Sequence, residues 1–408
     1  MTGTWLLTNA SVLDPARATI EPDQRVLVTD GVITEVGTDV TSTSAEVIDL
    51  RGAVLMPGLI DAHVHVAAAS ADLSALPRMS PSYTALHAAK ALRDMLHRGF
   101  TSVRDCGGAD HGLAGALRAG LVTGPRLHYA GKALSQTGGH GDVRGPGDDA
   151  GQAHYCCPDF GRVCDGVSEC RRAARDEIRK GAHHLKIMIS GGITSPTDRV
   201  DSTQFSIEEI RAIVEEASAA NRYVAGHAYT PAAIRRGVIN GVRSIEHGNF
   251  IDDATAEVVR DHGAFLVPTL VTYHALADGG RAAGLSDVTH AKIAEVLEAS
   301  LRGLETAHRN GVDVAFGTDL LGSLQTRQLT EFTLRAEVQK PADMIRSATT
   351  VGARLLGAEG LLGTVAPGAH ADLLAVDGNP LDDISVLTEP ERHQRLLMAG
   401  GRVVRRRD

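Results

Sequence analysis

Aromatic residues make up only 3% of the 408-residue sequence, and no run of 18 apolar residues occurs in it. A membrane-spanning helix needs such a run, so the sequence excludes one. The hydrophobic share is nevertheless 43%, which is enough to bury a sizeable core, and intrinsic disorder is not expected. With so few rings, that core must be packed mainly with Ala, Val, Leu and Ile side chains.

Basic residues are also in deficit, since 41 Lys and Arg stand against 50 Asp and Glu, a net charge of −9 with His neutral. This balance excludes a general binder of nucleic acids or of anionic membranes. The first residues contain neither a basic region nor a sustained apolar region. No secretory signal is therefore predicted, and we expect a cytoplasmic protein. The five cysteines are an odd number without framework spacing, which fits reduced thiols.

Short apolar runs separated by Gly, Asp and Pro occupy both ends of the chain, residues 1–56 and residues 363–408. Such runs are typical of short strands joined by turns. We predict that the two ends meet and form one small composite β-sandwich domain. The alternative is a pair of unrelated terminal hairpins.

A different pattern repeats between these ends. Seven times, an amphipathic helical segment ends at Gly or Asn and a short apolar strand follows at once, as at Gly181 before residues 185–188. With residues 59–63 as a further strand, this gives eight strands that alternate with helices, and we predict a (β/α)8 TIM barrel over residues 57–362. An open doubly wound sheet is the alternative, but no GxGxxG follows the first strand.

Histidines and one aspartate fall at the ends of several predicted strands. In a barrel, the carboxyl ends of the strands form the active-site rim. Each residue alone has a plainer explanation, since a lone His is more often a core residue and a lone Asp often caps a helix. Together they form a set of ligand types that Zn²⁺ prefers, namely His63, His65, His227, His247 and Asp319.

Lys186 lies inside an apolar strand, between Leu185 and Ile187. A buried ammonium group is costly unless it is paired. One solution is a salt bridge to a carboxylate, and the other is reaction with CO₂ to give a carbamate, whose two oxygens can bridge two cations. The nearby metal-ligand types favour carboxylation of Lys186.

On these residues the sequence resembles the amidohydrolase superfamily over nearly its whole length. The segments that carry the resemblance are 57–65, Lys186, His227, 244–248, 317–319 and 363–373. The resemblance implies a barrel with a composite β-sandwich and two divalent metal ions, with Zn²⁺ as the default and Mn²⁺ or Co²⁺ as alternatives. In the subtype with a carboxylated lysine, the implied ligands are His63, His65, Lys186, His227, His247 and Asp319.

Segments 137–142, 190–196, 227–229 and 317–322 resemble one branch of this superfamily, the Xaa-Pro dipeptidases, related carboxypeptidases and ochratoxin-degrading hydrolases. This implies hydrolysis of the amide bond of a dipeptide or an N-acyl amino acid, by a homo-oligomeric enzyme. The alternatives are ring opening of a cyclic amide or imidazolone, and hydrolysis of a xenobiotic amide, ester or carbamate. Lys186 argues against a deaminase, and the complete ligand set argues against a non-catalytic scaffold.

Four residues receive expected roles in catalysis and substrate binding. Asp319 is expected to take a proton from the nucleophilic water and to pass it to the leaving amine. His140 lies between two glycines in a long segment and is expected to contact substrate, and Tyr229 is expected to donate a hydrogen bond to the scissile carbonyl. Arg327 is the candidate for binding a substrate carboxylate, because guanidinium binds carboxylates bidentately. The plainer alternatives are a solvated His, a packed Tyr and an exposed Arg.

Four cysteines, Cys156, Cys157, Cys164 and Cys170, fall in or beside the same long segment. No paired CxxC spacing occurs, so a structural zinc site is weakly supported. We expect free thiols in a cap over the site. The preference for a substrate side chain is not readable from the sequence, because the loops that decide it are not predictable from one chain.

Overall fold

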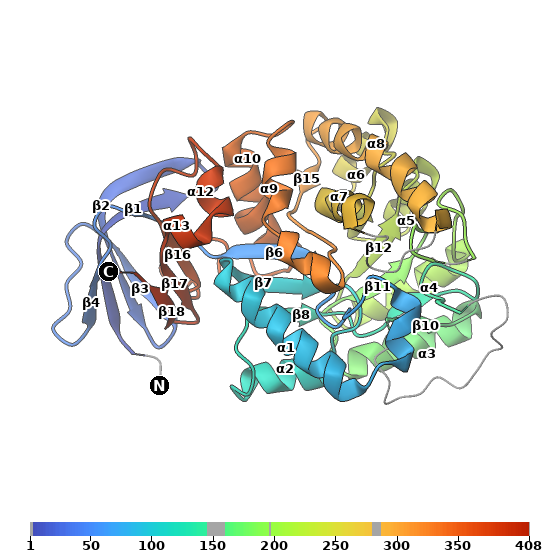
Figure 1. Cartoon of the computed structure of the whole chain (residues 1–408), viewed down its shortest axis with the longest axis horizontal. Coiled ribbons are helices and arrows are strands. Elements are labelled where there is room, and N and C mark those ends of the chain that lie inside the picture. The colour runs from blue at the N-terminus through green and yellow to red at the C-terminus, as the bar shows by residue number, and fades with distance from the viewer. Residues whose placement is uncertain (1–2, 145–159, 196, 280–286, 408) are drawn as a thin grey trace.

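The strands form three sheets in the computed structural model, which describes residues 3–144, 160–195, 197–279 and 287–407 (Figure 1). One sheet has eight strands and lies at one end of the molecule. The other two contain parallel strands and are surrounded by helices. No helix within the described ranges has the length and apolar character needed to cross a membrane.

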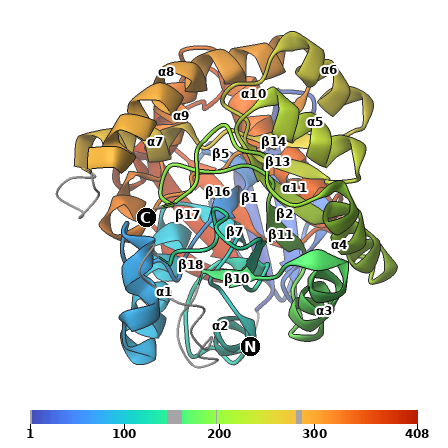
Figure 2. The same cartoon turned by 90° about the vertical axis from the view of Figure 1, so that its right-hand side faces the viewer.

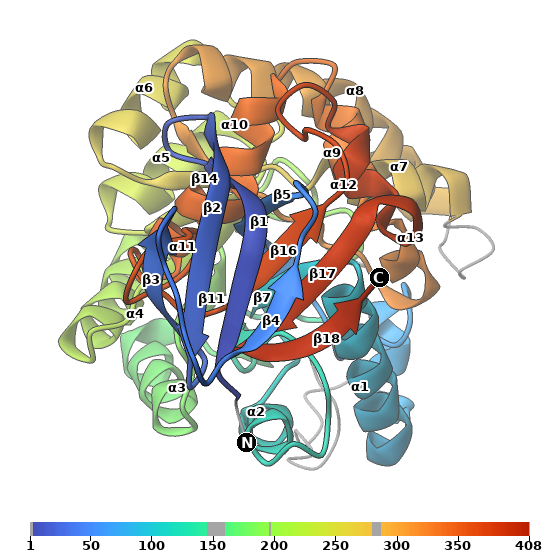
Figure 3. The same cartoon turned by 90° about the vertical axis from the view of Figure 1, so that its left-hand side faces the viewer.

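The eight-stranded sheet combines strands from both ends of the chain (Figure 3). Its order is β18-β17-β16-β5-β1-β2-β3, with β4 paired to β1. The antiparallel pairing of β16 with β5 joins the C-terminal strands to the N-terminal ones. The bounds are β1 Trp5–Asp14, β2 Thr19–Thr29, β3 Val32–Gly37, β4 Glu46–Asp49, β5 Val54–Pro57, β16 Leu373–Val376, β17 Gln394–Ala399 and β18 Arg402–Arg406.

Every strand pair in the other two sheets is parallel, in the orders β6-β7-β8 and β10-β9-β11-β12-β13-β14-β15. Backbone hydrogen bonds connect the two sheets on both sides, from Ala62 N to Phe316 O (2.7 Å) and from His183 N to Tyr129 O (2.9 Å). The bounds are β6 Leu59–Val64, β7 Phe100–Asp105, β8 Arg126–Tyr129, β9 Ala133–Ser135, β10 Gly161–Val163, β11 Leu185–Met188, β12 Val224–Ala228, β13 Ser244–His247, β14 Phe265–Val267 and β15 Asp313–Val314.

The helices lie around the outside of these parallel strands (Figure 2). The long helices occur between successive strands along the chain, with α7 and α8 together between β14 and β15, so the predicted α/β class with parallel strands is confirmed. The α-helices are α1 Pro81–His97, α2 His111–Arg118, α3 Gly166–Arg179, α4 Ile207–Ala219, α5 Pro231–Ile239, α6 Asp253–Asp261, α7 Leu270–Gly279, α8 Asp287–Arg309, α9 Thr330–Arg335, α10 Pro341–Arg346, α11 Gly352–Leu355, α12 Ser385–Thr388 and α13 Pro390–His393. Short 3-10 helices cover Leu73–Arg78 (η1) and Gly322–Arg327 (η2), and a π-helical turn covers Ser347–Val351 (η3).

The helix ends follow from local sequence. Helix α4 begins with the predicted capping box, in which the Ser206 and Glu209 side chains each accept the other residue's backbone N–H. Gly181 and Asn221, which precede β11 and β12, have φ values of 92° and 55°. A left-handed residue of this kind ends a helix and turns the chain back toward the sheet.

The segment between β8 and α3 contains structure that the sequence pattern did not predict. Its described part includes the three-residue strands β9 and β10, which pair with each other. Strand β9 also pairs with β11, at Leu134 and Ile187. Three residues are too few to produce a readable period, so tertiary pairing decides their conformation.

Candidate metal centre and active site

A cavity opens where the parallel strands end. Five of the six predicted metal ligands are less than 4% exposed, and the sixth, Asp319, has 20% of its side chain exposed. The structure brings all six together with two of the predicted substrate contacts. The cavity is lined by His63, His65, Leu73, His140, Phe160, Lys186, Met188, Ile193, Thr194, His227, Tyr229, His247, Thr272, Leu276, Asp319 and Leu321.

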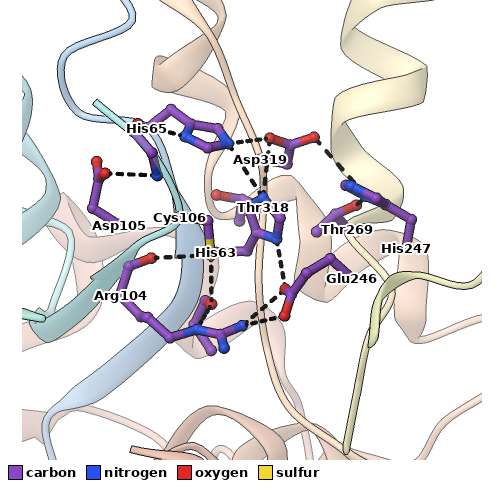
Figure 4. Close-up of polar contacts among 12 residues, drawn as sticks. His63, His65, Arg104, Asp105, Cys106, Glu246, His247, Thr269, Thr318 and Asp319 are labelled. Atoms are coloured by element: carbon purple, nitrogen blue, oxygen red, sulfur yellow. Dashed lines mark hydrogen bonds and ion pairs between the residues drawn. The ribbon is translucent and has the colours of Figure 1, made fainter. Parts of the chain in front are cut away.

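His63 and His65 come from the end of β6, and their Nε2 atoms lie 3.3 Å apart (Figure 4). His65 Nδ1 is 2.9 Å from the carbonyl oxygen of Gly107, and His63 Nδ1 is 2.7 Å from Glu246 Oε2. A carbonyl or carboxylate oxygen only accepts, so both Nδ1 atoms donate, and in the neutral form of each ring Nε2 is then the atom that carries the lone pair. The Asp319 carboxylate adds a third acceptor, with Oδ1 at 3.1 Å from His65 Nε2.

With both rings neutral, three acceptors lie close together, and a cation among them would relieve their mutual repulsion. His63, His65 and Asp319 offer ligand atoms within 4.8 Å of one another. Two imidazole nitrogens and a carboxylate are donors that zinc-type ions prefer. These residues therefore fit a divalent metal ion.

His227 and His247 add two more ring nitrogens from β12 and β13. His227 Nε2 is 3.1 Å from the carbonyl oxygen of Gly191, so Nε2 donates and Nδ1 is the free lone pair. His247 Nδ1 is 2.8 Å from Thr269 Oγ1, which leaves Nε2 available. Burial lowers the pKa of both rings well below the usual value, so they stay neutral, as metal ligands must be.

The backbone is strained at three positions of this cluster. His247, Thr269 and Asp319 have φ values of 77°, 49° and 52°. A left-handed conformation is costly for residues with a Cβ, above all for a β-branched threonine. Because Thr269 contacts His247 and Asp319 faces His65, the surrounding structure holds strained backbone where it positions these ligands.

Lys186 is 2% exposed on β11 and lines the cavity. Among the described residues, no carboxylate lies within 4.0 Å of its ammonium nitrogen. The salt bridge that the sequence left open as an alternative is therefore absent from the described part of the chain.

Glu246 and Arg104 support the site from below and received no role from sequence reasoning. The wholly buried Arg104 donates from Nη2 to both Glu246 oxygens at 2.8 Å, and from Nη1 to Ser244 Oγ at 2.9 Å. Glu246 in turn accepts from His63. A signal was present in the sequence, since Arg104, like Lys186, is a basic residue inside a predicted barrel strand.

Cys106 also lies near His63 and Glu246, and the three offer ligand atoms within 4.8 Å of one another. The Glu246 carboxylate already binds the guanidinium of Arg104 and the imidazole of His63 (Figure 4). A metal ion there would have to displace Arg104. We therefore interpret Glu246 and Arg104 as residues that hold His63 in position.

His140 and Tyr229 both line the cavity and pack against His227. The His140 ring stacks on that of His227, with centroids 4.2 Å apart, and Tyr229 meets His227 edge to face at 4.9 Å. Burial lowers the pKa of His140 to about 4 and raises that of Tyr229, so Tyr229 keeps its proton and can donate it in a hydrogen bond. The Tyr229 hydroxyl is 3.4 Å from that of Tyr273.

The structure does not bring Arg327 to the cavity. It ends η2, is partly exposed, and its guanidinium lies 2.8 Å from Asp278 Oδ2. Of the cysteines, Cys106, Cys164 and Cys170 are buried free thiols, and the sulfurs of Cys164 and Cys170 are 3.8 Å apart. Cys156 and Cys157 lie outside the described residues.

The sequence profile of the Amidohydrolase family matches residues 54–404. The chain belongs to this family. Ochratoxinase from Aspergillus niger is 34% identical to this amidohydrolase over 355 residues, covering 84% of this chain and 74% of that protein. The predicted family is therefore confirmed.

Solved structures resemble this amidohydrolase over its whole length. One, described as an amidohydrolase, is 48% identical with a TM-score of 0.97 and covers 99% of each chain. A second is a prolidase complexed with N-methylphosphonate-L-proline, 46% identical with a TM-score of 0.96, covering 99% of this chain and 100% of that one. Together with ochratoxinase, the prolidase matches the predicted branch of the family.

Proposed function

We propose that this amidohydrolase hydrolyses the amide bond that links an acyl or aminoacyl group to a C-terminal amino acid, in a dipeptide or an N-acyl amino acid. The observation that carries the proposal is the pair of Nε2 atoms of His63 and His65, 3.3 Å apart beside Asp319 in a cavity, because their Nδ1 atoms are both engaged by oxygen acceptors. The names of two relatives, prolidase and ochratoxinase, support the same bond type.

Two divalent metal ions, Zn²⁺ by default, would be held by His63, His65, Lys186, His227, His247 and Asp319. When bound, such ions lower the pKa of water and polarise a carbonyl group. We propose that Lys186 is carboxylated on Nζ, because its ammonium is buried without a carboxylate partner among the described residues. Carboxylation converts this uncompensated cation into an anionic ligand.

The remaining chemistry belongs to the protein's own side chains. Asp319 would take the proton of the attacking water on a carboxylate oxygen and pass it to the nitrogen of the leaving amine. Tyr229 would donate from its hydroxyl to the oxygen of the scissile carbonyl. His140 would contact the substrate from the side of His227.

The lining of the cavity suits a substrate with an apolar group. Six of the lining residues are apolar, namely Leu73, Phe160, Met188, Ile193, Leu276 and Leu321. Such a lining accommodates an apolar acyl group or side chain and offers few polar partners to a highly charged one. A xenobiotic amide is the second candidate, because one relative is named an ochratoxinase.

We also propose that the parallel strands belong to one closed (β/α)8 barrel over residues 57–362. The backbone hydrogen bonds that connect β6 to the segment after β15, and β8 to the start of β11, support this closure. Residues 1–56 and 363–408 would then form the composite β-sandwich domain. Their shared eight-stranded sheet supports this division.

The deciding experiment measures release of amino acids from a panel of dipeptides and N-acyl amino acids. Zinc-reconstituted protein is compared with the same protein after chelation. Chelator-sensitive release of one class of C-terminal residue is the expected result. No release from any member of the panel, with two metal ions bound, would contradict the proposed substrate class and move the choice to cyclic amides, esters or carbamates.

A further inference from the structure

A buried polar chain lies behind His140 and connects it to Asp198. His140 Nδ1 is 2.9 Å from Ser195 Oγ, and Ser195 Oγ also forms a short hydrogen bond with Asp198 Oδ1. The exposed fractions are 8% for His140, 4% for Ser195 and 3% for the side chain of Asp198. His140 comes from the segment after β9, whereas the other two come from the loop after β11.

The directions of these hydrogen bonds follow from the acceptors. The Asp198 carboxylate accepts from Gly192 N (3.2 Å) and from Gln204 Nε2 (2.8 Å), and it can only accept from Ser195 as well. Ser195 uses its one proton in that bond, so its oxygen must accept from His140. The His140 ring therefore carries its proton on Nδ1, and its Nε2 has no hydrogen-bond partner within the described ranges.

The plane of the His140 ring is fixed as well. One face stacks on His227, at a centroid distance of 4.2 Å and an interplanar angle of 26°. A Cβ atom on Gly192 would clash with the ring, so only glycine at that position lets the loop pack against it. The backbone N–H of His140 donates to Gln204 Oε1 at 2.9 Å. Gln204 thus binds both His140 and Asp198.

Lys292 of α8 fastens the loop that carries Ser195 and Asp198. Its ammonium donates to the carbonyl oxygens of Gly192 (3.1 Å), Ser195 (3.2 Å) and Asp198 (2.7 Å). It also lies 3.8 Å from Asp198 Oδ1. Three carbonyl oxygens and a carboxylate around one ammonium hold the loop in a single arrangement, since any rotation would break several charge-assisted bonds.

We propose that Asp198, acting through Ser195, is the positioning residue that sets the tautomer and ring orientation of His140, so that His140 Nε2 meets the bound substrate. Lys292 holds this pair in place from α8. The inference rests on the proposed function only in giving His140 a substrate to contact. The hydrogen-bond chain itself is independent of the identity of that substrate.

The test compares Ser195→Ala and Asp198→Asn with the wild type, as zinc-reconstituted proteins, on the best substrate of the panel. Each variant breaks the chain without touching a metal ligand. We expect kcat to fall about 10- to 100-fold, because a displaced group of this kind costs that much, while KM changes less than twofold. Ser195→Thr keeps the hydroxyl and should recover most of the loss. Ser202→Ala is the matched control, since its hydroxyl lies in the same loop and donates to Arg199 O, its one hydrogen-bond partner within the described ranges.

A second readout does not depend on turnover. The ¹⁵N shifts of the His140 ring, assigned by their loss in His140→Gln, should report the Nδ1–H tautomer in the wild type and a tautomer mixture in Ser195→Ala. Unchanged shifts in Ser195→Ala and Asp198→Asn would overturn the inference, whatever happens to kcat. If the wild type hydrolyses no member of the panel, the proposed function fails, while the tautomer measurement still decides the inference.

Discussion

His63 and His140 face the same cavity but are held in different ways. His63 lies in β6 and is held from below by Glu246 and Arg104, which are completely buried among the strands. His140 lies in a loop and is held from the side by Ser195 and Asp198, with Lys292 of α8 behind them. The strand-borne group is held by side chains of the strands themselves, whereas the loop-borne group is held by buried side chains of another loop and by Lys292.

This difference separates stability from activity. A change beneath His63 must disturb the packed interior of the sheet, and removing one partner of the buried Arg104–Glu246 pair leaves an uncompensated charge. A change behind His140 affects a loop that other hydrogen bonds still hold. We therefore expect the first kind of change to reduce folding stability and metal affinity, and the second kind to reduce turnover.

The largest effect is expected at Asp319, because it is both a proposed metal ligand and the proposed proton acceptor. Asp319→Asn removes the proton acceptor and one metal ligand, so kcat should fall by about 10²- to 10⁴-fold. Steady-state kinetics with parallel metal analysis by mass spectrometry measure both effects. Near-wild-type turnover in a variant that holds two metal ions would refute the assigned role.

Tyr229→Phe tests the substrate side of the comparison. Loss of a hydrogen-bond donor to the scissile carbonyl should lower kcat by about 10²- to 10³-fold, with metal content unchanged. Tyr273→Phe is a useful comparison, because the Tyr273 hydroxyl reaches Tyr229 and Asn249 and does not line the cavity. Equal losses in both variants would assign the effect to packing.

Glu246→Gln tests the metal side. The substitution leaves Arg104 buried beside a neutral amide, so the free energy of unfolding should fall by about 3–5 kcal/mol. Metal affinity should also fall about 10- to 100-fold, because His63 loses the carboxylate that orients it. Urea unfolding of the metal-free protein and chelator competition measure the two quantities. If Asp198→Asn destabilised the protein as much, the contrast between core and loop would be wrong.

His184 offers a smaller effect at the opposite ends of the strands. It is wholly buried and stacks on Tyr223, and neither ring nitrogen has a hydrogen-bond partner among the described residues. Burial, and next the charge of Arg104, lower its pKa well below the usual value. The folded protein therefore keeps His184 neutral, and the unfolded chain binds the extra proton.

Stability from this group is present above the unfolded pKa of about 6.5 and is lost as the pH falls below it. His184→Phe keeps the ring and removes the titration. We expect a change within about 1 kcal/mol at pH 7.5 and a weaker loss of stability between pH 7.5 and pH 5.5. Urea unfolding at the two pH values tests this, and an equal loss in both proteins would contradict it.

The smallest effect is expected at Arg327. Its guanidinium is paired with Asp278 and does not line the cavity. Arg327→Ala should therefore leave KM for a free-acid substrate within twofold. Folding stability should also change little, because exposed ion pairs contribute little to it. Kinetics on a dipeptide and on its C-terminal amide measure the effect on KM directly. A large rise in KM for the free acid alone would restore Arg327 as the carboxylate-binding residue.

Much of the site was predictable because it lies on strands. The two-residue period placed His63 and His65 on one face of β6, and the order of helices and strands placed His227 and His247 on the same rim. The roles of Ser195, Asp198 and Lys292 were not predictable, because they depend on how a loop folds over the cavity. Strands β9 and β10 were missed for a related reason, since three residues show no period.

The sequence by itself determined the parallel α/β class, the family and the set of metal-ligand types, because apolar periods and strand-end residues are local properties. Only the tertiary structure decided which partners hold those residues. It placed Arg104 beneath Glu246, turned His140 toward Ser195, and left Arg327 outside beside Asp278. Such contacts join residues far apart in the chain, and their geometry depends on packing that no local pattern records.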